Sequence, residues 1–516
     1  MNTTNLIFKK VNLYGFLLAF LSLCFAACSE KDLEEGPVAY DPSKPISISH
    51  FFPTEGGAME DLIIYGENFG TDKNAVNVTI GNKKAVVVSV AGDKIYCFVP
   101  SSAFTGEIVV TVKDSDGTEH STTAATKFNY LRKKVVSTLC GKTVDTGDQG
   151  TRYGSFAECT GFRNLGSMVY DPLQPNLLYI AYDESDRGIE VLDFATKQYY
   201  QLMSYNGFGT RRLRAIDFSK DGQYMLVAVD RDDRDFSTPS VFLLKRNSNG
   251  SFANSTPQEL VFFKQCNTVA VHPNGEIYFN SYNQGQVFRF ELENYLAAKG
   301  YIPGSGNSTP KWDGKLISSS ASDKSTGFEE VFQIKDSGNE FRICIHPSGK
   351  YAYLVVVNKH YILRTDYDEN THRFMVPYTV AGAESTSGWV DAVSTAARVK
   401  RPYNGVFVKN PDYVKQGRDD VYDFYFTDCE NFCVRYLTPD GVVRTYAGRG
   451  KSTNGNIWGT EDGDLRETAR FRDVSGIAYD EAEDAFYVLD QYNARIRRIG
   501  METDDNNDND NESTIK

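Results

Sequence analysis

This sequence contains few histidines, and it has fewer basic than acidic residues. Only 6 of the 516 residues are His, and the 55 Lys and Arg residues are outnumbered by 68 Asp and Glu, which gives a net charge of −13. A low histidine content limits the acid–base and metal chemistry that imidazole groups perform. A surface this acidic repels phosphate backbones, which argues against a nucleic-acid-binding protein.

Motifs of common enzymes are also missing. The sequence contains neither the G-x-S-x-G motif of serine hydrolases nor the H-E-x-x-H motif of zinc proteases. Gly450-Lys451-Ser452 matches the end of a phosphate-binding loop, but Thr445 stands where that motif requires glycine. We therefore predict no catalytic residue, no metal site and no cofactor, and we keep a lyase or hydrolase as the less favoured alternative.

Long apolar runs are absent after the first 28 residues. The run over residues 13–27 follows two lysines and is short for a membrane-spanning helix, as in an export signal. Its end, Phe25-Ala26-Ala27-Cys28, resembles the cleavage box of bacterial lipoproteins, in which the thiol of Cys28 is lipidated. This resemblance implies a lipoprotein signal peptide over residues 1–27, with a plain secretory signal as the alternative.

The residues after Cys28 are strongly acidic. The stretch SEKDLEE, residues 29–35, is similar to the tag that directs Bacteroidota lipoproteins to the outer face of the outer membrane. A solvated acidic tether without an address is the alternative. We expect residues 28–43 to form a tether and the protein to be lipid-anchored in the outer membrane, facing the cell exterior.

The nine cysteines form no regular disulfide framework. Removal of the signal and lipidation of Cys28 leave an odd number. Cys140 and Cys159 flank a predicted loop, and Cys429 and Cys433 flank a predicted hairpin turn, so either pair could form a disulfide. A C-x3-C spacing without a neighbouring His is a weak metal motif, and hairpin packing or a disulfide is the better interpretation.

Residues 44–131 contain short alternating strands separated by turns, which is typical of an all-β, immunoglobulin-like sandwich. The motif YGENFG over residues 65–70 and its flanking strands resemble IPT/TIG domains. We expect Gly66, Gly70 and Gly81 to lie in turns that need a positive φ. Because the strands show no convergent polar cluster, we interpret this domain as a spacer, with a binding domain as the alternative.

Residues 132–500 repeat a strand–turn–strand unit six times. Units of this length hold four strands each, as the blades of a β-propeller do, so we predict a six-bladed propeller. The first strands of the units contain Met168, Ile216, Val269, Ile343, Val406 and Ile477.

The last two units resemble NHL repeats. Segments 427–435 and 489–499 look like the hairpin between the second and third strands of that family, which implies an NHL-type propeller. Each segment contains an Asp and an Asn that we expect to cap the turn. These residues are Asp428 and Asn431 in the first segment and Asp490 and Asn493 in the second.

One strand of the propeller is displaced along the chain. A segment that looks like the fourth strand of a blade occupies residues 136–141, before the first unit, whereas the last unit ends near Ile499 without one. We predict that this N-terminal strand completes the last blade and closes the ring, which leaves no open sheet edge. Residues 501–516, rich in Asp and Asn, are predicted to be a disordered acidic tail.

Basic residues recur at one position of the repeat. Equivalent positions of a propeller lie at one radius, so these side chains would form a positive ring at the central channel that attracts a carboxylate or sulfate. The alternative is that they pair with nearby Asp and Glu side chains. The position lies five residues before the aligned apolar residue, and its basic occupants are Arg163, Arg211, Lys264, Arg401 and Arg472.

The three tryptophans, Trp312, Trp389 and Trp458, lie in long loops between blades. Sugars present flat C–H faces that stack on such rings, and rigid aromatic side chains anchor binding surfaces in general. Packing within the loops is the alternative interpretation. We expect the same face to include Tyr153, Tyr282 and Tyr403.

The order of tether, sandwich and propeller resembles accessory lipoproteins of Bacteroidota polysaccharide utilisation systems. This resemblance implies a non-catalytic glycan-binding protein that captures polysaccharide or oligosaccharide beside a TonB-dependent transporter and companion lipoproteins. The alternative is a protein-interaction platform that docks on an outer-membrane transporter complex.

Overall fold

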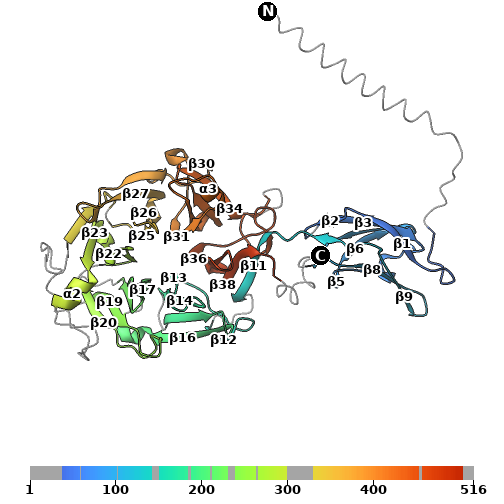
Figure 1. The fold of residues 1–516 in the computed structure, drawn as a ribbon, viewed down its shortest axis with the longest axis horizontal. Coiled ribbons are helices and arrows are strands. Elements are labelled where there is room, and N and C mark those ends of the chain that lie inside the picture. The colour runs from blue at the N-terminus through green and yellow to red at the C-terminus, as the bar shows by residue number, and fades with distance from the viewer. Residues whose placement is uncertain are drawn as a thin grey trace, which may run out of the picture. The chain divides into compact units, whose positions relative to one another are not determined.

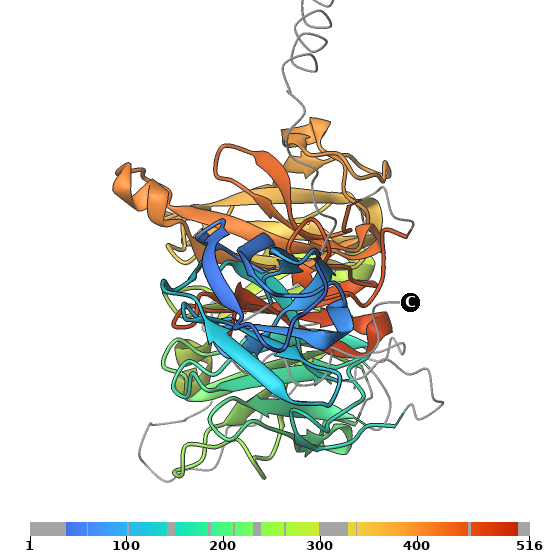
Figure 2. The same ribbon diagram turned by 90° about the vertical axis from the view of Figure 1, so that its right-hand side faces the viewer.

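The computed structural model describes residues 38–58, 60–100, 103–141, 150–183, 187–209, 212–230, 239–262, 265–298, 329–336, 338–451 and 456–503. The chain forms two compact units, the first ending at Arg132 and the second beginning at Lys133. Strands make up nearly all of the regular structure in both (Figure 1, Figure 2). The predicted signal peptide, Cys28 and most of the predicted tether and tail lie outside the described residues.

The first unit is a sandwich of two four-stranded antiparallel sheets, ordered β1-β3-β7-β6 and β5-β4-β8-β9. Alternate apolar residues of both sheets, such as Ile64 and Val78, are fully buried in one core. The short strands β2 and β10 pair in parallel. The strands are β1 (Ser47–Phe52), β2 (Glu55–Gly56), β3 (Asp61–Glu67), β4 (Val76–Ile80), β5 (Lys83–Lys84), β6 (Val86–Val90), β7 (Lys94–Phe98), β8 (Ile108–Lys113), β9 (Glu119–Thr123) and β10 (Asn129–Tyr130), with a 3-10 turn η1 (Lys73–Ala75).

Two of the three glycines singled out in the sandwich adopt the left-handed conformation. Gly70 has φ +76° and Gly81 has φ +55°. The prediction was wrong for Gly66, which lies within β3 and not among the residues with positive φ. Its missing side chain serves close packing instead, because a Cβ there would lie 2.0 Å from the carbonyl oxygen of Ser47.

The second unit is a six-bladed β-propeller, as predicted (Figure 1). Each blade is one antiparallel sheet, and the first strands of neighbouring blades contact one another in a closed ring. The strands of blade 1 are β13 (Leu165–Tyr170), β14 (Leu177–Tyr182), β15 (Gly188–Asp193), β16 (Gln198–Ser204) and the short β12 (Gly154–Ser155); those of blade 2 are β17 (Leu213–Phe218), β18 (Tyr224–Val229), β19 (Pro239–Lys245) and β20 (Gln258–Phe262); those of blade 3 are β21 (Val269–Val271), β22 (Glu276–Ser281), β23 (Gln286–Glu291) and β24 (Glu329–Gln333).

Blades 4 to 6 follow the same plan. In blade 4 the strands are β25 (Phe341–Ile345), β26 (Tyr351–Val356), β27 (Tyr361–Asp368), β28 (Arg373–Phe374) and β29 (Tyr378–Gly382); in blade 5, β31 (Pro402–Lys409), β32 (Tyr422–Asp428), β33 (Cys433–Leu437), β34 (Val442–Gly448) and the short β30 (Ala392–Val393); in blade 6, β36 (Val474–Asp480), β37 (Ala485–Asp490), β38 (Arg495–Met501), β11 (Lys134–Gly141) and the short β35 (Gly463–Asp464).

Short helical segments join some strands. None of the helices among the described residues is long and apolar enough to cross a membrane. The segments are α2 (Leu292–Ala298), α3 (Pro411–Lys415), η2 (Tyr205–Phe208), η3 (Tyr282–Gln284), η5 (Val357–Lys359), η6 (Ser394–Ala396), η7 (Cys429–Asn431) and η9 (Gln491–Asn493).

The N-terminal strand closes the ring, as predicted. Strand β11 pairs antiparallel with β38, with Val136 opposite Ile499, and supplies the outer strand of blade 6. Joining the two ends of the propeller in one sheet ties the first residues of this unit to the last. Opening the ring therefore requires the loss of a whole strand ladder rather than the fraying of one end.

The core of the propeller lies between blades rather than within them. In β18, Leu226 and Ala228 pack toward blade 3, whereas Met225 and Val227 pack toward blade 1. Because successive side chains of a strand point to opposite faces of the sheet, each strand contributes to the interfaces with both neighbouring blades. This explains why the second strands are apolar at almost every position, although antiparallel strands with one solvated face alternate.

Candidate functional site

The mouth of the central channel lies where the chain reaches the first strand of each blade. In every blade one residue here accepts, through its backbone carbonyl, the N–H of the residue that follows the second strand. Asp230 N–H donates to Arg212 O at 2.9 Å, for example, and Val357 N–H donates to Glu340 O at 3.0 Å. The repeated bond defines one equivalent position per blade, occupied by Asn164, Arg212, Gln265, Glu340, Arg401 and Asp473.

This ring position carries no net formal charge. Arg212 and Arg401 are balanced by Glu340 and Asp473, and the two remaining residues are amides. A ring of mixed sign has no single preference for an anion at its centre.

Three of the predicted basic residues are placed by the structure. Arg401 occupies the ring position, and Arg163 and Arg472 directly precede it, while Arg211 and Lys264 lie outside the described residues. The spacing differs between blades because β31 and β36 have register shifts near their first residues, whereas β25 pairs without one. A fixed count of five residues before the aligned apolar residue therefore does not give the same structural position in every blade.

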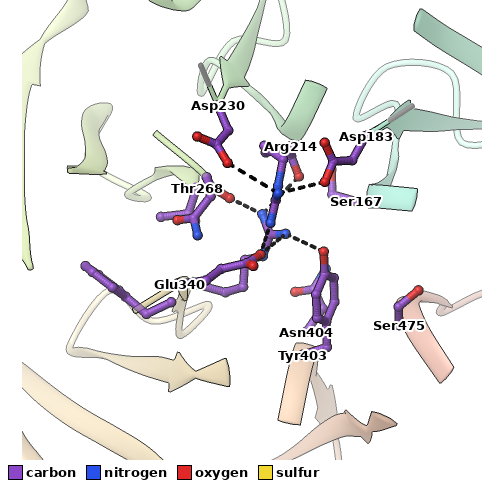
Figure 3. Close-up of polar contacts among 12 residues, drawn as sticks. Ser167, Asp183, Arg214, Asp230, Thr268, Glu340, Tyr403, Asn404 and Ser475 are labelled. Atoms are coloured by element: carbon purple, nitrogen blue, oxygen red, sulfur yellow. Dashed lines mark hydrogen bonds and ion pairs between the residues drawn. The ribbon is translucent and has the colours of Figure 1, made fainter. Parts of the chain in front are cut away.

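Two buried arginines, Arg214 and Arg342, lie at the mouth, and Figure 3 shows Arg214 between Asp183, Asp230 and Glu340. Arg214, 3% exposed, donates to Asp183 Oδ2 at 2.7 Å and also to Glu340. Arg342, equally buried, donates to Glu340 Oε1 and to the hydroxyl of Tyr403, both at 2.9 Å. We call Asp183, Arg212, Arg214, Asp230, Glu340 and Arg342 the central ion cluster.

Arg342 also joins three blades. Its Nη1 donates to the backbone oxygens of Arg214 in blade 2, at 3.0 Å, and of Asn267 beside blade 3. Arg212 adds ion pairs to Asp183 at 3.1 Å and to Asp230 at 2.9 Å. The cluster therefore satisfies its own charges, three arginines against three carboxylates, and ties the inner strands together.

The protonation states of the cluster follow from this pairing. Burial alone would raise the pKa of Glu340, but the guanidinium groups of Arg214 and Arg342 outweigh it and lower that pKa to about 2. At Asp230 burial is the larger effect, and its pKa is raised despite Arg214 and Arg212. No carboxylate of the cluster is left without a cation, which is the arrangement of a structural network.

Two half-exposed tryptophans lie against arginines on blades 5 and 6. The Trp389 ring, 40% exposed, has the Arg449 guanidinium 3.9 Å from its centroid, and its Nε1 donates to Thr445 Oγ1 at 2.9 Å. Arg466 donates to the backbone oxygen of Thr445 at 3.0 Å. Burial, together with the nearby Arg466 and Arg435, lowers the pKa of Arg449.

Blade 6 repeats the arrangement with a second ring. The Arg472 guanidinium lies 4.6 Å from the ring centroid of Trp458 and 5.3 Å from that of Tyr492. Trp458 is 38% exposed and Tyr492 is 57% exposed. Within the described residues, none of Arg449, Arg466 and Arg472 forms an ion pair with a carboxylate. We call Trp389, Thr445, Arg449, Arg466, Trp458, Arg472 and Tyr492 the tryptophan rim.

The other predicted aromatic residues are placed differently. Trp312 lies outside the described residues. Tyr403 is 8% exposed and belongs to the hydrogen bonds of the central ion cluster, as does Tyr282, whose hydroxyl donates to Asp230 Oδ1 at 2.9 Å. Tyr153 is exposed on blade 1 and donates to Glu190 Oε1 at 2.8 Å. The structure therefore does not bring these tyrosines together with Trp389 and Trp458.

Matching buried networks hold the two tryptophan loops. In blade 5, Arg435 is fully buried and donates to Asp428 Oδ2 at 2.9 Å and to Asp391 Oδ1 at 2.7 Å. Asn431 donates to the same Asp428 oxygen and, at 2.7 Å, to the carbonyl of Gly388, which precedes Trp389. The network thus fixes the loop on which Trp389 stands.

In blade 6, Arg497 contacts Asp490 and Asp462 in the same way, and Asn493 donates to the carbonyl of Gly459 at 2.7 Å. The expected capping by the aspartates was wrong, because neither carboxylate bonds to a backbone N–H of its own turn. Asp428 instead accepts from the N–H of Lys400, and Asp490 from that of Arg472. Each aspartate therefore links its turn to the loop that enters the blade.

Residues 45–130 match the IPT/TIG domain family. A solved Bacteroides thetaiotaomicron protein, provisionally named a phosphatase, is 46% identical over 90% of this chain and 99% of its own, with a TM-score of 0.74. An auxiliary nutrient binding protein of that organism is 39% identical over 90% and 100%, with a TM-score of 0.76. An auxiliary nutrient binding protein of Bacteroides ovatus is 32% identical over 90% and 100%, with a TM-score of 0.62.

The chain belongs to the same family as these Bacteroides proteins. No curated protein matches it. Because the matches span nearly the full length of the solved relatives, the family includes both the sandwich and the propeller of this chain.

In this family member the channel below the ion cluster holds a cavity of ≈ 290 Å³. Asp217 lines it and accepts the N–H of Phe218 at 2.8 Å and of Val271 at 2.7 Å, while burial raises its pKa to about 6. Burial also raises the pKa of Cys344 to about 12, which keeps this thiol protonated at neutral pH. Neither group is arranged as an activated nucleophile.

The two histidines of the repeats are buried and hydrogen-bonded. The His272 ring stacks on Tyr367 with 4.3 Å between centroids, and Nδ1 of His346 lies 2.7 Å from Ser348 Oγ. Both histidines therefore have a structural role in packing and in hydrogen bonding of their turns. In the described part of the chain, no group of three His, Cys, Asp or Glu side chains is arranged to hold a metal ion.

All seven described cysteines are free thiols in the structure. Cys140 and Cys159 lie together in a buried core, where a hydrogen bond from Cys140 lowers the pKa of Cys159. Burial raises the pKa of both Cys429 and Cys433 well above that of a free thiol. Packing in the hairpin, one of the two interpretations of the second pair, therefore describes Cys429 and Cys433 here.

Proposed function

We propose that this chain is a non-catalytic, cell-surface glycan-binding lipoprotein that captures polysaccharide for a TonB-dependent importer. The observation that carries this proposal is the tryptophan rim, where half-exposed indole rings lie beside arginines that have no carboxylate partner among the described residues. Two relatives of this chain are named auxiliary nutrient binding proteins, which supports a binding role.

The rim offers both kinds of contact that a sugar uses. Indole rings provide a flat apolar surface for the C–H face of a pyranose, and guanidinium groups donate hydrogen bonds to hydroxyl, carboxylate or sulfate oxygens. Because Asn431 and Asn493 fix the loops of Trp389 and Trp458, little ordering entropy is lost on binding. Two such positions on one face suit a polymer that contacts both at once.

Capture without cleavage is favoured by the state of the acidic groups. Asp183, Asp230 and Glu340 at the channel mouth are each engaged with arginine, so no free pair of carboxylates is positioned for acid–base work there. The buried thiol and carboxyl of the channel are likewise held by burial and backbone hydrogen bonds.

The placement on the cell surface rests on the N-terminal sequence. Lipidation of Cys28, an acidic tether and a sandwich used as a spacer would present the propeller to the exterior. Mass spectrometry of the protein extracted from membranes tests this part, and an unmodified N-terminus without lipid would contradict it.

Affinity electrophoresis tests the binding function. The purified protein is run through gels that contain neutral or acidic polysaccharides, and the recovered polymers are analysed for shortened chains. We expect retardation without products, and its loss in Trp389→Ala and Trp458→Ala.

Phe104→Ala is the matched control, since Phe104 is 42% exposed and has Arg132 over its ring in the sandwich. Retardation that is equally weakened by this control would show that the rim is not the site. A failure of every polymer to retard the protein would overturn glycan capture and favour docking on a transporter complex.

A further inference from the structure

Eight arginines of the propeller lie over aromatic rings within the described residues, and six of them also form an ion pair with a carboxylate. Arg418 is an example, because its guanidinium lies 4.1 Å from the ring centroid of Tyr413 and 2.6 Å from Asp440 Oδ2. Most arginines that lie over rings in this propeller are therefore neutralised as well. The paired six are Arg187, Arg246, Arg342, Arg364, Arg418 and Arg497, with N–O distances of 2.5–2.9 Å.

Arg449 and Arg472 of the tryptophan rim are the two exceptions. Each lies over an indole ring, but neither forms an ion pair with a carboxylate in the described part of the chain. Nη1 of Arg449 donates to the backbone oxygen of Asn431 at 3.0 Å, which holds the guanidinium in place without neutralising it. The side chain of Arg472 is exposed and donates no hydrogen bond to a described residue. Stacking therefore positions these two cations while their charge stays available to a ligand.

The acidic residues around the rim are mostly bound to other cations. Asp391, which accepts from the hydroxyl of Thr445, lies 2.7 Å from Arg435. Asp473 directly follows Arg472, but burial raises its pKa and so opposes its negative charge. An anion at the rim would thus meet cations that have no partner rather than free carboxylates. The other pairs are Lys400–Glu430 at 3.3 Å, Lys451–Glu467 at 2.8 Å and Arg470–Glu461 at 3.4 Å.

A third arginine adds to the positive charge beside Trp389. Arg466 donates to the carbonyl of Thr445, the residue whose hydroxyl accepts from the Trp389 indole. Burial, together with the positive charges of Arg466 and Arg435, lowers the pKa of Arg449. Like charges brought together in this way repel one another, and a bound anion would relieve the repulsion.

A ligand that satisfies both parts of the rim carries a flat apolar face and an anionic group close together. Trp389 and Trp458 are half-exposed, so a pyranose that stacks on either indole places its ring substituents near the guanidinium group. Carboxylate and sulfate oxygens match the planar fork of guanidinium donors and form stronger hydrogen bonds with it than neutral hydroxyl groups do. Sugar residues with an acidic substituent meet both requirements, and a polymer of them can present one to each tryptophan.

We propose that the glycan captured at the tryptophan rim is an acidic polysaccharide, whose sugar residues bear carboxylate or sulfate groups. One such group binds to Arg449 and Arg466 beside Trp389, and another binds to Arg472 beside Trp458. This inference rests on the proposed glycan-binding function and adds the charge of the ligand to it.

Pairs of polysaccharides that differ only in charge test this inference by affinity electrophoresis. Polygalacturonate and alginate are compared with their carboxyl-reduced forms, and carrageenan is compared with its desulfated galactan. For at least one pair, we expect the acidic polymer to retard the unaltered protein at a concentration at least about 10-fold lower than its neutral form does. The pair that shows the difference identifies carboxylate or sulfate as the bound group.

Substitutions then locate the effect of charge. The double variant Arg449→Gln/Arg472→Gln should reduce the preference for the acidic polymer to less than about 3-fold, because only stacking and neutral hydrogen bonds remain. Arg418→Gln is the matched control, since Arg418 also lies over a ring but is already paired with Asp440. This control should keep the full preference, and denaturant unfolding of each variant verifies that it is folded.

The outcomes separate this inference from the function on which it rests. Equal retardation by the charged and the neutral member of every pair that binds would overturn the inference, while glycan capture would stand. A preference that survives in the folded double variant, or that is lost equally in Arg418→Gln, would place the anionic contacts elsewhere and overturn it too. If no polymer retards the protein, the proposed function fails together with this inference.

Discussion

Arginine is used in two opposite ways in this propeller. In the central ion cluster, Arg214 and Arg342 are buried and surrounded by carboxylates and backbone oxygens. In the tryptophan rim, Arg449 is half-buried and Arg472 is exposed; both lie against indole rings and have no carboxylate partner within the described residues. Cations whose charge is neutralised internally hold a fold together, whereas cations stacked on exposed rings keep their hydrogen bonds available to a ligand.

Removing a central arginine should have the largest effect on stability. Arg214→Met leaves Asp183, Asp230 and Glu340 with one cation fewer in a buried place, which costs about 3–5 kcal/mol of unfolding free energy. Arg449→Met in the rim should cost less than about 1 kcal/mol, as expected of a half-exposed cation. Denaturant unfolding followed by tryptophan fluorescence measures both. Equal losses in the two variants would contradict the division between structural and ligand-facing arginines.

Acid should act on the centre and not on the rim. The pKa of Glu340 is lowered from 4.5 to about 2, so its ion pairs stabilise the fold above about pH 4.5, and this stabilisation is lost as the pH falls toward 2. The loss amounts to about 3 kcal/mol. Glu340→Gln should flatten the decline of unfolding free energy over this range, whereas Glu467→Gln, an exposed control, should leave it unchanged. If Glu340→Gln left the dependence of unfolding free energy on pH unchanged, the arginine partners would not lower the pKa of Glu340.

Neutralising a rim arginine should impair binding more than folding. A hydrogen bond from a charged donor contributes about 1.5–3 kcal/mol, so Arg472→Gln should weaken the binding of an acidic polysaccharide at least about 10-fold. Arg373→Gln, which removes an exposed arginine paired with Glu329, is the control and should bind normally. Gel retardation at several polymer concentrations gives the ratio, and equal affinities of the two variants would remove Arg472 from the site.

Salt should have the smallest of these effects and should act on binding at the rim. Raising the ionic strength from 0.1 M to 1 M shortens the screening length from about 10 Å to about 3 Å. Binding of acidic polymers at the rim should weaken severalfold, whereas binding of a neutral polysaccharide, which depends on stacking, should be unchanged. Calorimetric titrations at the two salt concentrations measure both, and salt-insensitive binding of acidic polymers would remove the arginines from the contacts.

Much of the fold could be predicted from the sequence because it is encoded in local repeats. The six strand–turn–strand units and the displaced strand before the first unit were enough to predict the blades and the closure by β11. Gly66 was misjudged because its role is a close approach to Ser47, a contact across strands that no local motif reveals.

The candidate site could be predicted only in part. Trp389 and Trp458 were recognisable because they stand in long loops before turns. Their arginine partners were harder to predict. Arg472 was predicted to belong to a positive ring at the channel, and Arg449, which directly follows β34, belongs to no motif that indicates binding. The ion pairs of Arg214 and Arg342 could not be predicted in this way. They depend on the register of the strands, which shifts beside Arg214 in β17 but not in β25, and that register is known only from the structure.

Calorimetric titration of the Trp389→Ala/Trp458→Ala double variant beside the unaltered protein tests glycan capture at the rim most directly. The ligand is the polysaccharide that retards the unaltered protein, and chromatography of the recovered ligand follows each titration. We expect at least a 100-fold loss of affinity in the variant and ligand of unchanged length in both samples. Unchanged affinity in the double variant, or shortened chains produced by the unaltered protein, would contradict non-catalytic capture at the tryptophan rim.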